Sequence, residues 1–199
     1  MTLDSGLTDS STPEAVNTHL LPGSQLCLAC GLCCRGVVVT RAVLMPDEVE
    51  KAERLNLSVC RQGKQDLFAL PCAYHVDKKC SIYEERFKVC GGYQCEMLKR
   101  LLAGEVNLDQ ALEIVRMVQR LEQEIYQLLG KHDASKSVWD LFNEFLNTEH
   151  NTSGEALKSH PELLLKARML SLLGNKYFEP KLDAELNAAV QPLRASIPS

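Results

Sequence analysis

The C-terminal half of the chain has apolar residues at a helical period. Between residues 108 and 129 they recur every three or four positions, which predicts an amphipathic helix of about five turns. Asn107 is the expected N-cap with Gln110 at the third helical position, and Gly130 is expected to end the helix. We expect the apolar face to form core rather than the wall of a cofactor pocket. It comprises Leu108, Ala111, Leu112, Ile114, Val115, Val118, Leu121, Ile125 and Leu128.

Two further helices are predicted after the first. One covers about Val138 to Leu146, preceded by Ser137-x-x-Asp140, a pattern that resembles a capping box. Its tryptophan, Trp139, is expected to pack in the core. The next begins near Ser159-His160-Pro161-Glu162 and is expected to stop at Gly174-Asn175. The prolines that follow, Pro180, Pro192 and Pro198, predict a partly frayed end.

The N-terminal half has shorter runs and more turn formers. Gly36 to Thr40 and Leu67 to Leu70 are predicted as short strands, because they are β-branched or apolar and bounded by turn residues. A helix is expected from Pro46, with Val49, Ala52 and Leu55 on its apolar face. Asp77-Lys78-Lys79 is expected to form a turn.

These patterns predict a mainly α protein in three parts. Residues 1–24 are rich in Ser, Thr and Asp and are expected to form a flexible tail. Residues 25–100 are expected to form an irregular cysteine-rich metal-binding module with one or two short strands. Residues 101–199 are expected to pack on it as about three helices. Few apolar residues lie in 25–95, so we expect bound metal to supply much of the order there.

Composition and charge narrow the classes of function. The 199 residues are 45% hydrophobic and 24% charged, as in an ordinary globular protein. The net charge of −4 gives no support for binding nucleic acid or an anionic membrane. The first 26 residues lack the basic and apolar regions of a secretory signal, and no run is long enough to span a membrane. We therefore expect a cytoplasmic protein whose acidic helical half binds a protein partner.

All nine cysteines lie between Cys27 and Cys95, and in residues 27–100 Lys and Arg exceed Asp and Glu by three. Cytosolic thiols stay reduced, and clustered cysteines there bind metal more often than they form disulfides. The run Cys-x2-Cys-x2-Cys matches the first three ligands of a bacterial ferredoxin, in which a remote cysteine completes the cluster. The predicted metal ligands are Cys27, Cys30, Cys33, Cys34, Cys72, Cys80, Cys90 and Cys95.

The spacing leaves the number and kind of metal sites open. Eight thiols suit two four-cysteine zinc sites, two iron–sulfur clusters, or one cluster with four thiols left over. Neighbouring side chains diverge, so Cys33 and Cys34 do not easily bind one ion together. Cys60, alone between the two groups, is expected to be a small buried apolar residue. His75 lies three residues beyond Cys72 and is left outside the predicted ligand set.

The cysteine pattern resembles the CxxCxxCC family, described as a zinc- or iron-chelating domain. The resemblance rests on Cys27-x-x-Cys30-Gly31-x-Cys33-Cys34, on Cys72, and on the stretch from Cys80 to Cys90 that reads CSIYEERFKVC. It covers about residues 25–95. Ala73-Tyr74-His75, Phe87 and Gly91 stand where the family usually has Pro-Phe-Leu, Pro and Arg.

The resemblance implies metal or iron–sulfur binding, because the same module occurs in flagellin lysine N-methylases. Tyr83 and Arg86, which lie between two of the predicted ligands, are candidates for hydrogen bonds to the sulfur atoms. A surface salt bridge and a packed ring are equally good interpretations of these two residues.

Four functions remain in order of preference. The first is an iron–sulfur protein, with a 4Fe–4S cluster as one form, acting in electron transfer or as an accessory of an oxidoreductase. The second is a non-catalytic interaction module stabilised by zinc, and the third is a metal-handling protein. A thiol-redox enzyme is weaker, because no βαβ pattern surrounds the Cys-x-x-Cys pairs. Whether the protein is an enzyme stays open, and no catalytic residue is predicted.

Overall fold

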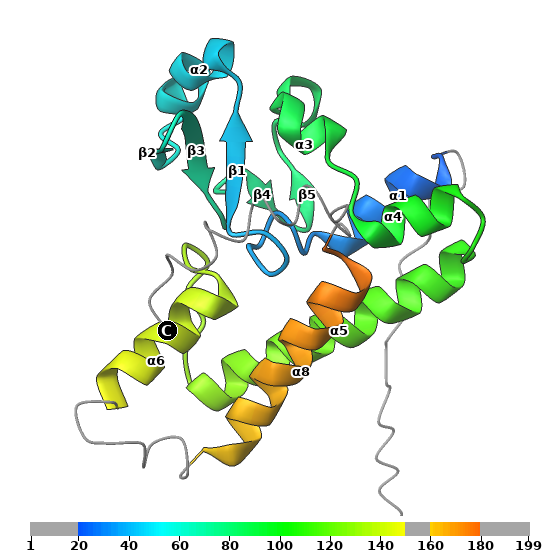
Figure 1. The fold of residues 1–199 in the computed structure, drawn as a ribbon, viewed down its shortest axis with the longest axis vertical. Coiled ribbons are helices and arrows are strands. Elements are labelled where there is room, and N and C mark those ends of the chain that lie inside the picture. Colours follow the sequence, from blue (N-terminus) through cyan, green and yellow to red (C-terminus); the bar gives the residue numbers. More distant parts are fainter. Residues whose placement is uncertain (1–19, 150–159, 180–199) are drawn as a thin grey trace, which may run out of the picture.

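The computed structural model describes residues 20–149 and 160–179 of the chain. The fold is mainly α, with a small helical and sheet layer at one end of a helical assembly (Figure 1). The prolines beyond residue 179 and the first 19 residues of the expected tail lie outside the described residues. No helix within the described ranges is both long enough and apolar enough to cross a membrane.

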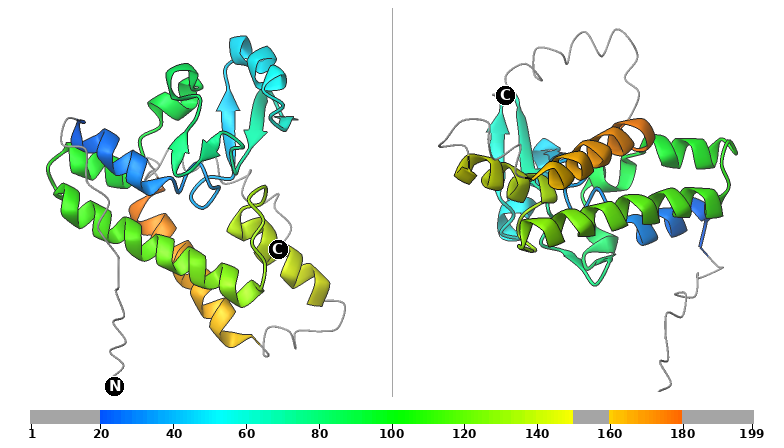
Figure 2. Two further views of the ribbon diagram at one scale, coloured as in Figure 1. Left: turned by 180° about the vertical axis from the view of Figure 1, so that it is seen from behind. Right: turned by 90° about the horizontal axis from the view of Figure 1, so that it is seen from below.

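The helical part is built around one long helix. Helix α5 (Leu108–Leu129) contacts α1 (Pro22–Cys30), α4 (Glu96–Leu102), α6 (Val138–Glu149) and α8 (Pro161–Tyr177). Figure 2 shows α8 and α1 on α5 from two further directions. Since α1 begins at Pro22, the predicted boundary of the tail at residue 24 is wrong.

The ends of α5 and, apart from Leu128, its apolar face were predicted correctly. Asn107 Oδ1 accepts a hydrogen bond from the Gln110 N–H at 2.9 Å, and Gln110 Oε1 accepts one from the Asn107 N–H at 3.0 Å. Gly130 ends the helix in the left-handed conformation at φ 62°. Leu128 is 39% exposed, whereas Tyr126 and Glu122 are buried on the face that contacts the other helices.

The third predicted helix ends later than its glycine suggested. Helix α8 runs on to Tyr177, three residues past Gly174, and the Phe178 N–H donates to the Gly174 carbonyl at 2.9 Å. Phe178 is only 1% exposed, so burial of its ring outweighs the weak helix propensity of glycine. Helix α6 begins as predicted, because Ser137 and Asp140 exchange hydrogen bonds at its start.

The sheet part contains two antiparallel sheets. The first has the strand order β1–β3–β2. Its strands are β1 (Arg41–Leu44), β2 (Val59–Gln62) and β3 (Gln65–Ala69). In its register Leu67 lies opposite Val43 on one side and Cys60 on the other. The second sheet is a hairpin of β4 (His75–Val76) and β5 (Lys79–Cys80), with the predicted turn between them.

Short helical turns flank these strands. A 3-10 turn (Pro46–Glu48) leads into α2 (Val49–Arg54), which confirms the helix predicted from Pro46. A second 3-10 turn (Tyr83–Glu85) and α3 (Lys88–Gly92) follow the hairpin.

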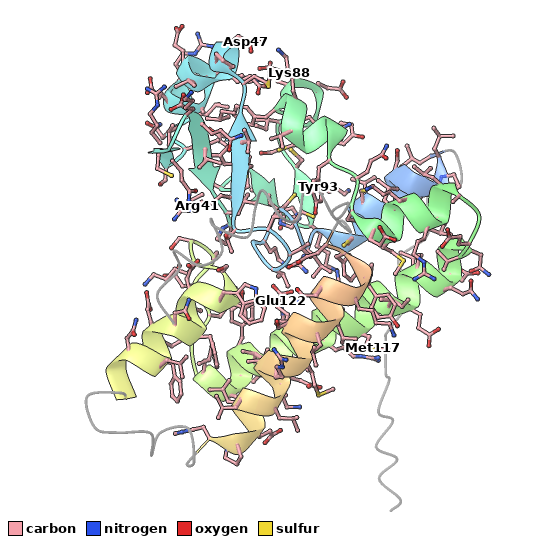
Figure 3. All side chains as sticks on the ribbon, in the orientation of Figure 1. Arg41, Asp47, Lys88, Tyr93, Met117 and Glu122 are labelled. Atoms are coloured by element: carbon pink, nitrogen blue, oxygen red, sulfur yellow. The ribbon has the colours of Figure 1, made fainter. Side chains whose placement is uncertain are left out.

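A buried carboxylate positions α3. Glu48 Oε1 accepts from the Lys88 N–H at 2.7 Å, and Glu48 Oε2 accepts from the Met45 N–H at 3.0 Å. The ion pair between Lys88 and Asp47, at 2.6 Å, joins the same two segments at the surface (Figure 3).

One predicted strand is absent from the described residues, and one observed strand was not predicted. Residues 36–40 form turns and bends, and β1 begins only at Arg41. Val37 is buried, and its carbonyl accepts a hydrogen bond from Trp139 Nε1 at 2.8 Å, so α6 rather than a strand holds this segment. Strand β2 escaped prediction because half of it is exposed and polar, whereas β3 lies close to the predicted Leu67–Leu70.

The described part of the chain has two clusters of buried apolar residues. The first fills the space between α5 and its neighbours. The second, in the sheet part, consists of Ala42, Leu44, Ala52, Leu57, Phe68, Leu70 and Phe87. The expectation that residues 25–95 lack apolar material for a core is therefore wrong. Within this second cluster, the ring centroids of Phe68 and Phe87 lie 5.1 Å apart.

Candidate metal centre

The first two cysteines lie on a helix, within the segment that the sequence predicts as an irregular module. Cys27 and Cys30 are three residues apart on α1, so their side chains share one face. Gly31 ends α1 at φ 59°, and its N–H donates to the Cys27 carbonyl at 3.2 Å. Cys33 and Cys34 follow in the turns after Gly31, where the chain leaves the helical part for the sheet part.

Cys95 approaches these residues from a distant part of the sequence. It is the N-cap of α4, where its Sγ accepts from the Leu98 N–H at 3.4 Å, and α4 packs against α1. We call Cys27, Cys30, Cys33 and Cys95 the helical thiol group. Burial, followed by the charge of Cys95, raises the pKa of Cys27. Burial, followed by the charges of Cys30 and Cys95, raises the pKa of Cys33 well above its ordinary range.

The other four predicted ligands gather in the sheet part. The Cys34 carbonyl accepts from the Cys72 N–H at 2.8 Å, Cys80 ends strand β5, and Cys90 lies in α3. We call Cys34, Cys72, Cys80 and Cys90 the sheet thiol group. Burial, then the charges of Cys72 and Cys80, raises the pKa of Cys34 to about 11. Burial, then the charges of Cys34 and Cys72, raises the pKa of Cys90 to about 12.

Cys60 lies apart from both groups, as its isolated position in the sequence suggested. It is on β2, half-buried rather than buried, and its Sγ accepts from Arg41 Nη1 at 2.9 Å. Among the described residues it therefore offers a thiol on the same chain that can serve as a control for the other eight.

Helix α5 supports the cysteine run through two polar side chains that sequence reasoning missed. Glu122 is fully buried and accepts from Arg35, the residue after Cys34, at 2.9 Å from Nη2 and 3.1 Å from Nε. One turn earlier, Gln119 Nε2 donates to the carbonyls of Ala29 and Cys30, both at 2.9 Å. Glu122 is labelled on α5 in Figure 3. The available signal was a carboxylate between Leu121 and Ile125 on an otherwise apolar face.

Gly31 is a point where the side chains of Arg35 and His75 approach the backbone closely. A Cβ atom there would lie 2.8 Å from Arg35 Nη1 and 2.8 Å from His75 Nε2, and the positive φ adds strain. His75 is opposite Cys80 in the hairpin, and burial, then the charge of Arg35, lowers its pKa. The structure thus places His75 beside the predicted ligands, although sequence reasoning left it outside the set.

Tyr93 carries a buried hydroxyl without a hydrogen-bond partner among the described residues. It lies between α3 and α4 (Figure 3), and burial, then the charges of Cys33 and Cys95, raises its pKa. A buried donor without an acceptor is costly, and a metal-bound thiolate is a good acceptor. This hydroxyl therefore fits a charged thiolate centre better than neutral thiols.

Arg86 and Tyr83 form a stacked pair rather than the surface salt bridge considered from the sequence. The Arg86 guanidinium lies 4.2 Å from the centre of the Tyr83 ring. A Cβ on Gly91 would lie 3.3 Å from Arg86 Nε, so this glycine leaves room for the guanidinium against α3. The positive charge of Arg86 acts on Cys27, where it opposes the effect of burial on the thiol pKa.

The thiols are neighbours but do not form a finished coordination shell. In residues 20–149 and 160–179, no three His, Cys, Asp or Glu side chains converge as ligands of one metal ion. The nine cysteines in this part of the chain are all free.

Comparisons with models of protein families, with curated sequences and with solved structures find no match to this chain.

Proposed function

We propose that this chain is an iron–sulfur protein that acts in electron transfer or as an accessory of an oxidoreductase. The observation that carries the proposal is the position of Cys95 next to the run Cys27, Cys30 and Cys33. Three cysteines in a Cys-x2-Cys-x2-Cys run, completed by a remote fourth, form the ligand pattern of a ferredoxin-type cluster. The resemblance to the CxxCxxCC family points in the same direction.

The residues around the helical thiol group suit a negatively charged centre. The unpartnered Tyr93 hydroxyl can donate a hydrogen bond to a thiolate of Cys33 or Cys95, and Arg35 supplies positive charge near Cys30. Hydrogen bonds to sulfur and burial are the means by which proteins set the reduction potential of a cluster. Binding requires the thiols to turn toward a common centre, a rotation between side-chain rotamers.

When bound, an iron–sulfur cluster supplies one-electron redox chemistry. The protein's part is to hold, shield and tune it. Glu122 and Gln119 on α5 fix the segment that carries Cys30 to Arg35, and Cys30 is buried while Cys33 and Cys95 are half-buried. A protein partner that exchanges electrons with the centre belongs to the same proposal.

A zinc-stabilised interaction module is the second candidate, and the sheet thiol group favours it. Its members come from four segments separated by 37, 7 and 9 residues, and they link the loop after α1, the hairpin and α3. A closed site of four thiolates that joins separate segments is typical of structural zinc. Such a module predicts loss of tertiary structure in the sheet part after chelation.

Elemental analysis of protein purified without air and without a metal-affinity tag separates the candidates. We expect iron and acid-labile sulfide in equal amounts, about four of each for a 4Fe–4S cluster, with Cys60→Ser indistinguishable from the wild type. Zinc without sulfide would replace the iron–sulfur proposal with the zinc module. Protein that binds neither metal after anaerobic reconstitution with iron and sulfide, or with zinc, would overturn both.

A further inference from the structure

We propose that the eight cysteines form two separate four-thiolate metal centres, divided between the adjacent residues Cys33 and Cys34. The first centre is the helical thiol group and the second is the sheet thiol group, both as defined above. The inference rests on the proposed metal binding and adds a definite ligand partition, which the sequence left open.

Backbone geometry holds the first set together. Cys27 and Cys30 lie on the same face of α1. Helix α4 packs against α1, and Cys95 is the N-cap residue of α4. Cys30 and Cys95 both contact the first apolar cluster. Cys33 is two residues after the helix-ending Gly31, so it turns back toward the end of α1 that carries Cys30.

A different set of contacts holds the second group together. The hydrogen bond from the Cys72 N–H to the Cys34 carbonyl brings these two residues side by side. The His75 N–H then donates to the Cys72 carbonyl at 3.0 Å, and His75 pairs with Cys80 across the hairpin. Helix α3, which carries Cys90, packs against β1. Cys72 contacts the second apolar cluster, not the first.

The charges that act on the thiols follow the same division except at Cys34. Charges of other members of the helical group act on Cys30 and Cys33, and charges of the three other members of the sheet group act on Cys90. Across the boundary, Cys34 acts on its neighbour Cys33 more strongly than Cys27 does, and Cys27 acts on Cys34.

One cation lies between the two proposed centres. Arg35 acts on Cys30 and on Cys34, and its guanidinium is held by Glu122. A four-thiolate site around a divalent ion keeps a net negative charge, so two adjacent sites repel each other. A shared arginine reduces that repulsion, and Gly31 lets Arg35 and His75 approach the end of α1 closely.

The test compares the metal content of the full-length chain with that of single serine variants, two for each proposed centre. Cys33→Ser and Cys95→Ser remove ligands of the first proposed centre, while Cys34→Ser and Cys90→Ser remove ligands of the second. Each protein is reconstituted anaerobically with Co²⁺ alone, whose thiolate absorption reports the sites, and then with Zn²⁺ for stoichiometry. Cys60→Ser is the matched control, because Cys60 lies outside both groups.

We expect the wild type and Cys60→Ser to bind two ions and each of the four variants to lose one. Combining two substitutions from the same group should lose no more than one ion, and combining Cys95→Ser with Cys90→Ser should lose both. If Cys33→Ser and Cys34→Ser abolish the same site, or if the wild type holds a single centre that all four variants destroy, the division is wrong. A wild type that binds neither Co²⁺ nor Zn²⁺ also refutes the two four-thiolate centres, whereas the iron–sulfur proposal fails only if reconstitution with iron and sulfide gives no cluster.

A measurement on the wild type keeps the test decisive if a variant fails to fold. The metal-loaded chain is treated with limiting chelator and then alkylated, and the modified cysteines are located by mass spectrometry. We expect the eight thiols to lose protection in two blocks of four, with Cys34 in a different block from Cys33. Loss of protection as one block of eight would refute two separate centres.

Discussion

Replacement of Glu122 by glutamine tests whether α5 holds the cysteine run in place. The wild-type carboxylate is fully buried and accepts three hydrogen bonds from Arg35, at 2.9, 3.1 and 3.2 Å. Glutamine has nearly the same volume but no charge, and it offers one acceptor atom instead of two. The substitution therefore leaves the guanidinium without its counter-charge and adds almost no cavity.

The size of the effect follows from the burial of the two partners. Removing one member of a buried ion pair costs about 3–5 kcal/mol, because the other charge stays buried and unpaired. The Arg35 side chain is 24% exposed and can reach water in part, so we expect a loss of about 2–3 kcal/mol in the free energy of unfolding. Metal binding at the proposed helical centre should weaken as well, because Arg35 also donates to the Cys30 carbonyl at 3.2 Å.

Urea unfolding followed by circular dichroism measures the loss, with metal content determined on the same samples. Glu124→Gln is the matched control, because it removes a carboxylate from the same helix. The wild-type Glu124 carboxylate pairs with Lys166 at 2.8 Å near the surface. Such pairs contribute under about 1 kcal/mol. Equal destabilisation by the two variants would refute the assigned role of Glu122. Replacing both members of the pair, with Arg35→Met and Glu122→Leu, should recover most of the stability.

Four further outcomes are expected. Tyr93→Phe should keep the metal content but shift the reduction potential or the charge-transfer spectrum, and an unchanged spectrum would contradict hydrogen bonding to thiolate. Gly31→Ala should lower both stability and metal content, because its Cβ would lie 2.8 Å from Arg35; Gly92→Ala, which meets nothing, is the control in both assays. Phe87→Ala should cost about 3–5 kcal/mol in urea unfolding, since the ring is 1% exposed. In metal-free protein, burial raises the pKa of Cys34 from 9.0 to about 11, so unfolding free energy should fall between those pH values and not below them.

Local signals were enough to predict the helices. The period of apolar residues, the Asn107–Gln110 box and the Ser137–Asp140 pair are all properties of neighbouring residues, and the structure has each of them where the sequence placed it. The errors came where a distant contact decided the outcome. Val37 is held by Trp139, and Phe178 extends α8 beyond Gly174, and neither interaction leaves a mark in the local pattern.

The eight candidate ligands could be named from their spacing, but their partners could not. Spacing places Cys27, Cys30 and Cys33 near one another, since they are separated by two residues each. It does not say that Cys95 also lies near them, because that depends on the packing of α4 on α1. The supporting residues Gln119 and Glu122 lie about 90 residues from the run in sequence, so only the fold shows what they contact.

The position of the cysteine run gives the proposed metal centres a role in a protein that already has two apolar clusters. Residues 31–40 are turns and bends that connect the helical part to the sheet part, and regular hydrogen bonding gives them little rigidity. Turn hydrogen bonds hold them locally, such as the one from the Val37 N–H to the Leu32 carbonyl at 2.9 Å, and Glu122 on Arg35 and Trp139 on Val37 hold them from outside. Metal ligation at Cys33 on one side and Cys34 on the other would join the two clusters through a single peptide bond. On this view the clusters stabilise each part, and the proposed centres determine how the parts are held together.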